Sequence, residues 1–344
     1  MLKTARDFLE YIIEGKRLTR KDSYSLMRGL MEGEFTSSQM GALLSSLRMR
    51  KEDGEEIAGF AEAMREKAMN FSVSSLSVAD NCGTGGDGQG TFNISTASAF
   101  VALSSGLKIV KHGNRSVSSR CGSADLLEIL GIKVDMEREK MQTLFEETGF
   151  AFLYAPLYHP ATRTVQGVRK ELGIRTVFNL LGPLTNPCPM DYKLVGVYSP
   201  ELVEPVASTL VTLGVKRGLV VWGEPGVDEI SITGETKLAL VEGSKITFSS
   251  FHPEEVGFPI RNIEELKGGA PPENAQIFMN ILRGEEKGGR REAVILNSAF
   301  LLWVGEKASD LEEAIERVEE ALRSGRALQT LHQVVKVSRA LGGE

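Results

Sequence analysis

Short β-rich runs alternate with helical runs from residue 106 onward, and this alternation restricts the fold more than any other feature. The β-rich runs are GLKIVKHG (106–113), FAFLYAP (150–156), YKLVGVYS (192–199) and VKRGLVVWG (215–223). The helical runs between them cover 123–131, 159–173 and 200–214. This order predicts a mostly parallel β-sheet flanked by helices. Ligands of such sheets bind beyond the carboxyl ends of the strands, so the loops after these runs are candidate sites.

The first seventy residues contain no strand candidate and predict four short helices with tight connections. Phe8, Tyr11 and Ile12 lie on one helical face, and Thr36 and Gln39 have the spacing of a capping box. Four short helices cannot bury such apolar stripes completely. We therefore expect a small helical bundle that packs against the rest of the chain or a second copy. The change of pattern places a helical domain at 1–72 and an α/β domain at 73–344.

Composition excludes several classes of protein. The 344 residues carry a net charge of −6, which argues against a general nucleic-acid binder. The three cysteines, Cys82, Cys121 and Cys188, have neither an even number nor metal-site spacing, which favours a reducing compartment. The N-terminus does not resemble a signal peptide, and no apolar run is long enough for a membrane span. We expect a cytoplasmic protein that binds no membrane.

A glycine-rich stretch, DNCGTGGDGQGTFNISTASAF (80–100), precedes the first β-rich run. Five glycines fall within eight positions, and a helix of small apolar residues follows. Loop amides next to a helix N-terminus favour phosphate. A Rossmann site needs an acidic residue about twenty positions later, and a P-loop needs Gly-Lys-Ser/Thr; neither is found here. A diphosphate and ribose loop of another kind and a plain turn remain.

Three more groups are candidates for chemistry. KHGNRSVSSRCGSAD (111–125) follows a β-rich run and favours a phosphate-binding loop, with a solvated basic loop as the alternative. His159 begins a predicted helix in which Arg169 lies about three turns later on one face; a surface cation is the alternative. Asp228 and Glu229 are adjacent in a loop, which indicates magnesium or a solvated acidic turn.

Together these segments, with YHPATRTVQGVRKELGIRTVFNLLGPLTNP (158–187) and GVDEIS (226–231), resemble the anthranilate phosphoribosyltransferases of tryptophan biosynthesis in order and spacing. The resemblance covers nearly the whole chain. It implies a nucleoside phosphorylase-like fold, with a helical contribution from about 160–188 to the small domain. It also implies a homodimer, joined through the first seventy residues and the segment near NLLGPLTNP.

The implied reaction transfers the phosphoribosyl group of 5-phosphoribosyl 1-diphosphate to the amine of anthranilate. The products are N-(5-phosphoribosyl)anthranilate and diphosphate, and two magnesium ions per subunit assist. The implied donor contacts are Gly83, Gly86, Asp87, Thr91, Asn93, Ile94, Ser95, Thr96, Lys111, His112, Gly113, Asn114, Arg115, Ser116, Val117, Ser118, Ser119 and Ser123. The implied anthranilate contacts are Gly83, His112, Asn114, His159 and Arg169. The implied magnesium ligands are Ser95, Asp228 and Glu229.

The chemistry needs few catalytic groups. Diphosphate leaves from C1 of the ribose through an oxocarbenium-like transition state, so the protein must offset the charge of the leaving group and position the amine. An aromatic amine is neutral at pH 7, and we therefore expect no general acid or base. Lys111 is expected to act electrostatically on the leaving group, and the planar fork of Arg169 suits the benzoate carboxylate.

The chain departs from the family pattern at three positions. Cys121 stands where serine is more usual, Cys82 precedes the glycine loop, and Trp222 stands where a small residue or histidine is more usual. Two alternative functions remain. A pyrimidine nucleoside phosphorylase has Lys-His-Ser-Thr-Gly-Gly at the first loop, which Asn81-Cys82-Gly83-Thr84-Gly85-Gly86 fits poorly. A non-catalytic nucleic-acid-binding relative would be basic and would lack Arg169 and the acidic pair.

Overall fold

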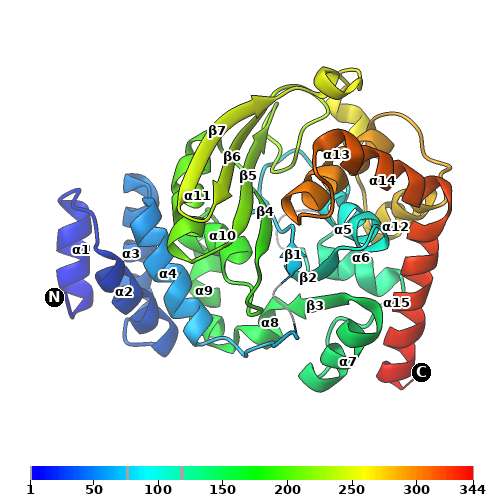
Figure 1. Ribbon diagram of the computed structural model, residues 1–344. Helices are drawn as coiled ribbons and strands as arrows, with labels where there is room; N and C mark the ends of the chain where they lie inside the picture. Colours follow the sequence, from blue (N-terminus) through cyan, green and yellow to red (C-terminus); the bar gives the residue numbers. More distant parts are fainter. Residues whose placement is uncertain (1, 75–76, 117–119, 344) are drawn as a thin grey trace.

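The computed structural model describes residues 2–74, 77–116 and 120–343, and it begins with a bundle of four helices (Figure 1). These are α1 (Ala5–Ile13), α2 (Arg20–Glu32), α3 (Ser37–Arg50) and α4 (Gly54–Glu66). The predicted capping box is confirmed, because the Thr36 hydroxyl accepts from the Gln39 amide and the Gln39 side chain accepts from the Thr36 amide. The apolar core of the bundle also includes Val168 and Val177, which belong to later helices.

A seven-stranded sheet forms the centre of the molecule, in the order β3-β2-β1-β4-β5-β6-β7. Its strands are β1 (Val78–Asp80), β2 (Lys108–Gly113), β3 (Phe150–Tyr154), β4 (Tyr192–Gly196), β5 (Arg217–Gly223), β6 (Thr236–Glu242) and β7 (Lys245–Phe251). β1 to β5 are parallel, and β6 and β7 add an antiparallel hairpin. The predicted mostly parallel sheet is confirmed. The chain reverses its direction of growth at β1, since β2 and β3 lie on one side and β4 on the other.

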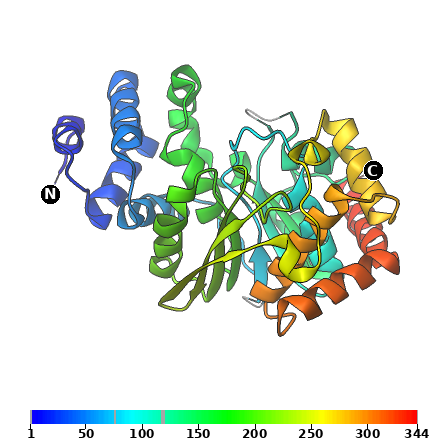
Figure 2. The same ribbon diagram turned by 90° about the horizontal axis from the view of Figure 1, so that it is seen from above.

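Helices cover both faces of the sheet, and Figure 2 shows the N-terminal and C-terminal helices at opposite ends of the molecule. Successive side chains of β5 point to opposite faces of the sheet and so belong to two different apolar cores. Leu219 is in the core that includes α5 (Ile94–Ser104) and α13 (Gly289–Val304), and Val220 is in the core that includes α11 (Val203–Thr212). The other α-helices are α6 (Ser123–Ile129), α7 (Arg138–Thr148), α8 (Ala155–Tyr158), α9 (Arg163–Leu172), α10 (Val177–Leu181), α12 (Pro271–Leu282), α14 (Leu311–Arg323) and α15 (Arg326–Gly342). The 3-10 helices are η1 (Pro160–Thr162), η2 (Gly182–Leu184), η3 (Pro200–Leu202), η4 (Pro253–Val256) and η5 (Ile263–Leu266).

The expected single helix from His159 to Arg169 is wrong. α8 ends before His159, whose φ of −123° is not helical, and the 3-10 turn η1 then precedes α9. Pro160 explains the break, because the residue before a proline is displaced from the α region. His159 and Arg169 therefore do not share a helical face, and each must be placed by its own contacts.

Two further segments bear on the site and on the expected dimer. Lys111 and His112 lie inside β2, as the expected β-rich run 106–113 has them, and their backbones pair with Phe152 and Leu153 of β3. The segment 179–187 is mostly buried within the chain, so it offers little surface to a second copy. Its Asn186 side chain donates hydrogen bonds to the Asp80 carboxylate (2.9 Å) and to the Val110 carbonyl (2.8 Å).

Contacts between α4 and α11 attach the bundle to the sheet. Gly54 begins α4, and a Cβ placed there would lie 2.9 Å from the side chain of Ser208 on α11. The Thr209 hydroxyl donates to the Gly54 carbonyl at 3.0 Å. In the ranges that the structure describes, no helix is both long enough and apolar enough to cross a membrane.

Candidate active site

The glycine loop leaves the carboxyl end of β1, where the sheet changes direction. Parallel sheets bind ligands in the crevice at such a point. The Thr84 amide donates to the carbonyl of Gly196 at the end of β4 (2.9 Å), so the loop lies across the crevice. Gly86 has a φ of +70°, a conformation that glycine adopts without strain.

Asp228 lies against this loop. Its carboxylate accepts a hydrogen bond from the Gly85 amide at 2.7 Å. A Cβ at Gly83 would lie 2.3 Å from the same carboxylate, so a side chain at position 83 would displace it. Burial and the neighbouring charge of Asp87 raise the pKa of Asp228 to about 6. Asp87 is also partly buried, and burial raises the pKa of its carboxylate.

Glu229 points to a different part of the site, the N-terminus of α5. Its carboxylate accepts from the Ser95 amide at 3.1 Å. Burial and the charge of Asp228 raise its pKa well above the ordinary value, and Lys111 opposes that shift. As predicted, the two acidic residues lie in a loop, after β5. That loop is what allows adjacent side chains to reach two places.

Lys111 supplies the cation beside these carboxylates. It is only 2% exposed, and its ammonium donates to the Asn81 side chain at 3.0 Å and to the Ser95 hydroxyl at 3.4 Å. The side-chain nitrogen of Asn81 also donates to the Ser95 carbonyl at 2.7 Å. Sequence reasoning assigned no role to Asn81. The only signal was its place at the carboxyl end of a strand, which it shares with many structural residues.

The donor set of Ser95, Asp228 and Glu229 fits magnesium. All three offer hard oxygen atoms, and the two carboxylates are buried with raised pKa values, which a divalent cation would reverse. Among the described residues no three His, Cys, Asp or Glu side chains are grouped as a metal site. Magnesium typically combines one or two carboxylates with substrate phosphates.

The other candidate residues at the start of α5, Asn93, Ile94 and Thr96, have different surroundings. Ile94 is in the apolar core, so only its backbone can face a ligand. The Thr96 hydroxyl is buried without a hydrogen-bond partner among the described residues. The Asn93 side chain donates to the Cys121 carbonyl at 3.0 Å and accepts from Asn274 at 2.8 Å, which ties the start of α5 to the second loop.

The loop after β2 is only partly described. Val117, Ser118 and Ser119 lie outside the described residues. Arg115 is paired with Glu128 (2.5 Å) and donates to the Tyr154 hydroxyl (2.6 Å), so its charge is already offset. The Ser116 amide donates to Asp125 at 2.9 Å. Gly113 is the last residue of β2. The Ser123 hydroxyl donates to the Asn114 carbonyl at 3.4 Å. Thr91, another predicted donor contact, forms an isolated antiparallel bridge with Lys267.

His112 and His159 meet at the side of the crevice formed by β2 and the α8–α9 connection. Their ring centroids are 5.0 Å apart. Burial lowers the pKa of His112 to about 4 and that of His159 to about 3. His112 Nδ1 lies 2.9 Å from the Gly182 carbonyl, which can only accept, so this nitrogen carries the proton. Both Nε2 atoms are buried without a partner among the described residues.

Arg169 lies near the end of α9 and stacks on Phe178 of α10, with its guanidinium carbon 4.9 Å from the ring centroid. Burial lowers its pKa. A desolvated cation of this kind favours an anionic partner. Among the described residues no hydrogen bond joins Arg169 to the acidic pair or to the glycine loop, so Arg169 makes no direct polar contact with that part of the predicted site.

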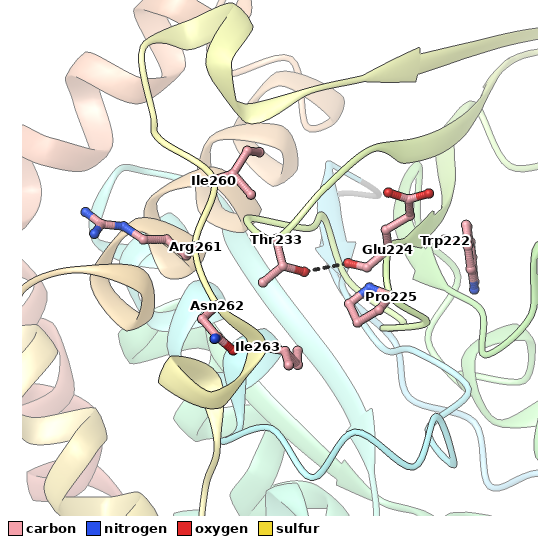
Figure 3. Close-up of a pocket in the computed structure, with 8 residues that line it drawn as sticks. All are labelled: Trp222, Glu224, Pro225, Thr233, Ile260, Arg261, Asn262 and Ile263. Atoms are coloured by element: carbon pink, nitrogen blue, oxygen red, sulfur yellow. Dashed lines mark hydrogen bonds between the residues drawn. The ribbon is translucent and has the colours of Figure 1, made fainter.

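Trp222 lines a pocket between the end of β5 and the segment before η5 (Figure 3). The pocket has a volume of about 690 Å³, and its lining residues are Trp222, Glu224, Pro225, Thr233, Ile260, Arg261, Asn262 and Ile263. None of them is a predicted site residue, and neither Asp228 nor Glu229 is among them. Cys121 is buried and Cys82 is partly buried, and neither forms a disulfide with another described residue.

Two family models match this chain. A model described as the α/β domain of a glycosyl transferase family matches residues 75–328, and one described as the helical bundle domain of that family matches 6–68. The chain belongs to this glycosyl transferase family.

Within it, the chain is a member of the anthranilate phosphoribosyltransferase group. It is 44% identical over 336 residues to the anthranilate phosphoribosyltransferase of Thermoanaerobacter sp. (strain X514), covering 98% of this chain and 99% of that one. The resemblance inferred from the motifs is confirmed.

Solved structures agree with this membership. The anthranilate phosphoribosyltransferase of Thermus thermophilus aligns with a TM-score of 0.90 and 44% identity over 96% of this chain and 99% of that chain. The enzyme from Saccharomyces cerevisiae, in complex with PRPP and Mg, aligns with a TM-score of 0.87 and 29% identity over 98% of both chains. The yeast enzyme has also been solved with 4-fluoroanthranilate, with a TM-score of 0.86 and 27% identity over 98% of this chain and 99% of that chain.

Proposed function

We propose that this chain is an anthranilate phosphoribosyltransferase, which moves the phosphoribosyl group of 5-phosphoribosyl 1-diphosphate to the amine of anthranilate. The observation that carries the proposal is the convergence of the glycine loop, the acidic pair and Lys111 where the sheet changes direction. Loop amides, a helix N-terminus and a buried cation suit a diphosphate group. Family membership supplies the same activity.

The donor is held by the glycine loop and the residues at the start of α5. Magnesium, when bound, would offset charge on the diphosphate, and Ser95, Asp228 and Glu229 would hold it there. Because Asp228 faces Gly85 and Glu229 faces Ser95, we propose two ions per subunit, one near each carboxylate. Lys111 stays beside the leaving group throughout and stabilises its negative charge.

We propose that the acceptor binds beside Arg169 and the two histidines. Arg169 would bind the carboxylate of anthranilate, and Asn114 and Gly83 would contact the same substrate. His112 and His159 form a wall, since their pKa values of about 4 and 3 keep both rings neutral at pH 7. A neutral wall suits an uncharged aromatic amine, and the amine attacks without a general base. Positioning then supplies most of the rate acceleration.

One assay tests the activity and both alternatives. Loss of anthranilate fluorescence is followed with 5-phosphoribosyl 1-diphosphate and magnesium, and parallel reactions omit the donor or the metal. We expect loss only in the complete reaction. Thymidine and uridine with inorganic phosphate test for a nucleoside phosphorylase, and retention on single-stranded DNA at low salt tests for a nucleic-acid binder. Phosphorolysis without anthranilate turnover would contradict the proposal.

The proposal extends to assembly and location. We propose a cytoplasmic homodimer joined through the helical domain, which comprises residues 1–72 with the helical segments of 160–188; the α/β domain covers 73–344. Exposed apolar side chains on the bundle support this interface, since Ile13 is 72% exposed and Met49 is 86% exposed. Among the described residues Cys82, Cys121 and Cys188 form no disulfide, which agrees with a reducing compartment.

A further inference from the structure

The glycine loop is anchored to the sheet by its first residues. The Thr84 amide donates to the carbonyl of Gly196 in β4 at 2.9 Å, and the Gly85 amide donates to Asp228 at 2.7 Å. Both partners lie at the carboxyl ends of strands or just beyond them. These two bonds fix the near edge of the loop to the side of the molecule that holds the acidic pair.

The next residue of the loop is held from the opposite side. The Gly86 carbonyl accepts a hydrogen bond from the guanidinium of Arg175 at 2.7 Å. Arg175 lies between α9 and α10, and both helices pack in the core of the helical bundle through Val168 and Val177. The loop thus spans two anchors, one on the sheet and one on the helical side.

Tyr198 holds the guanidinium of Arg175 in place. The guanidinium carbon lies 4.3 Å from the centroid of the Tyr198 ring, and this tyrosine is only 9% exposed. The Tyr198 hydroxyl accepts from Arg48 of α3 at 3.0 Å, and its amide donates to the Thr84 hydroxyl at 3.1 Å. Stacking of this kind restricts a guanidinium that is otherwise exposed to solvent.

We propose that Arg175 is a positioning residue for the phosphoribosyl donor. By accepting this bond, the Gly86 carbonyl oxygen is turned away from the diphosphate. The Thr84 and Gly85 amides are already bonded to Gly196 and Asp228, so the amides of Gly86 and Asp87 are the ones that would face that anion. The inference rests on the proposed function. It adds a role for the α9–α10 connection, which follows the helix of the acceptor residue Arg169, in shaping the loop that binds the donor.

The role of Arg175 is separable from stability. The Gly86 carbonyl and the Arg175 side chain are both at the surface, so removing the bond leaves no buried polar group without a partner. We therefore expect Arg175→Ala to melt at the temperature of the wild type. An exposed cation at the start of the preceding helix, Arg163 of α9, provides the matched control Arg163→Ala.

The test measures KM for each substrate, kcat, and donor binding by calorimetry with magnesium but without anthranilate. We expect Arg175→Ala to raise the donor KM and the donor dissociation constant about tenfold, which corresponds to about 1.4 kcal/mol. The anthranilate KM should change less than about twofold, the size of an ordinary surface substitution. Arg175→Lys, which keeps a donor but loses the planar stack, should be intermediate, and Arg163→Ala should match the wild type.

Three results would overturn the inference: an unchanged donor constant, an equal rise of both KM values, or a fall in melting temperature that accounts for the kinetic change. Absence of anthranilate turnover in the wild type would count against the proposed function instead. The donor titration would still compare the Arg175 variants with the control in that case, so the two failures are distinguishable.

Discussion

Arg169 is held in a position that favours an anionic ligand. Its guanidinium stacks on Phe178 and is largely withdrawn from water, which lowers its pKa. Among the described residues no carboxylate lies within ion-pair distance of it. A planar guanidinium can bind a benzoate carboxylate through two parallel hydrogen bonds, and the contact with the Phe178 ring restricts the position of the guanidinium.

Arg169→Ala should therefore raise the KM for anthranilate far more than the KM for the donor. A hydrogen bond to a charged group contributes about 1.5–3 kcal/mol, so the increase should be roughly tenfold to a hundredfold. Steady-state kinetics with each substrate varied in turn measure both constants. Lys170→Ala, at the next and exposed position, is the control. Equal increases in the two constants would remove Arg169 from the acceptor pocket.

The acidic pair allows a test of metal dependence. Asp228→Asn combined with Glu229→Gln should lower turnover strongly and move the magnesium optimum to higher concentration, because the metal would then be held mainly by the diphosphate. The pKa of Asp228, about 6, is above its unfolded value, so its charge destabilises the metal-free fold at pH 7. The melting temperature of the double variant without magnesium should therefore not fall.

Initial rates against magnesium concentration decide this prediction. Glu224→Gln, an exposed carboxylate in the same loop, should give the wild-type curve. If the curve of the double variant superimposed on that of the wild type, the pair would be a solvated acidic turn with no part in metal binding.

Some site residues cannot be found from their neighbours in the sequence. The glycine loop, the acidic pair and Lys111 were predictable because unusual residue types cluster there. Asn81 and Arg175 are single polar residues whose partners, Lys111 and Gly86, lie 30 and 89 positions away in the sequence. Only the meeting of distant segments gives such residues a role, and no local spacing encodes that meeting.

At the level of elements, the longer buried parallel strands were predictable, whereas the short strand β1 and the exposed strand β7 were not. β2 to β5 are buried and β-rich, so their pattern is strong. β1 has three residues, too few for any periodicity, and it is defined by its pairing with β2 and β4. Most side chains of β7 are exposed, so its sequence, KITFSSF, lacks an apolar alternation.

The pair His112–His159 connects β2 to the α8–α9 turn and should make that connection sensitive to acid. Both rings are buried and neutral, with pKa values of about 4 and 3, whereas an unfolded histidine binds a proton below about pH 6.5. The unfolded state therefore gains protons first as pH falls from 6.5 towards 4, and stability decreases. The loss at pH 5 should be about 2 kcal/mol per histidine.

Urea unfolding at pH 7.5 and pH 5 measures this effect. His159→Leu should lose less stability between the two pH values than the wild type, by about 2 kcal/mol. The acidic pair is present in both proteins, so its opposite contribution cancels in the comparison. His332→Leu, at an exposed position of α15, should behave as the wild type. Equal losses in His159→Leu and the wild type would show that His159 is not held neutral.

At the scale of the whole molecule, exposed apolar side chains lie on the helical bundle and on one edge of the sheet. Ile13 and Met49 expose apolar side chains on the bundle, and Phe248 does so on the edge strand β7. The segment 179–187, which the motif resemblance places at the dimer contact, is mostly buried within the chain, and this leaves the bundle as the surface for a second copy. A stable interface buries about 800 Å² per partner, which a few helices can provide.

Light scattering at micromolar concentration should give the mass of two chains. Ile13→Asp with Met49→Asp should shift the protein towards one chain, because two charges would have to be desolvated at the contact. Phe248→Asp, an equally apolar exposed position away from the bundle, should leave the mass unchanged. A monomeric wild type, or loss of the dimer only in Phe248→Asp, would contradict an interface on the bundle.

The packing of α4 on α11 has a consequence for how the two parts of this chain can be separated. The helical-bundle family model ends at residue 68 and the α/β family model begins at residue 75, which places a domain boundary between them. Yet Gly54 lies against Ser208 with no room for a methyl group, and the Thr209 hydroxyl is hydrogen-bonded to its carbonyl. If the chain were cut between α4 and β1, the two fragments would therefore stay associated through the contact of α4 with α11. Neither half could be recombined freely with a relative's counterpart, because the surface that each must match is the other's.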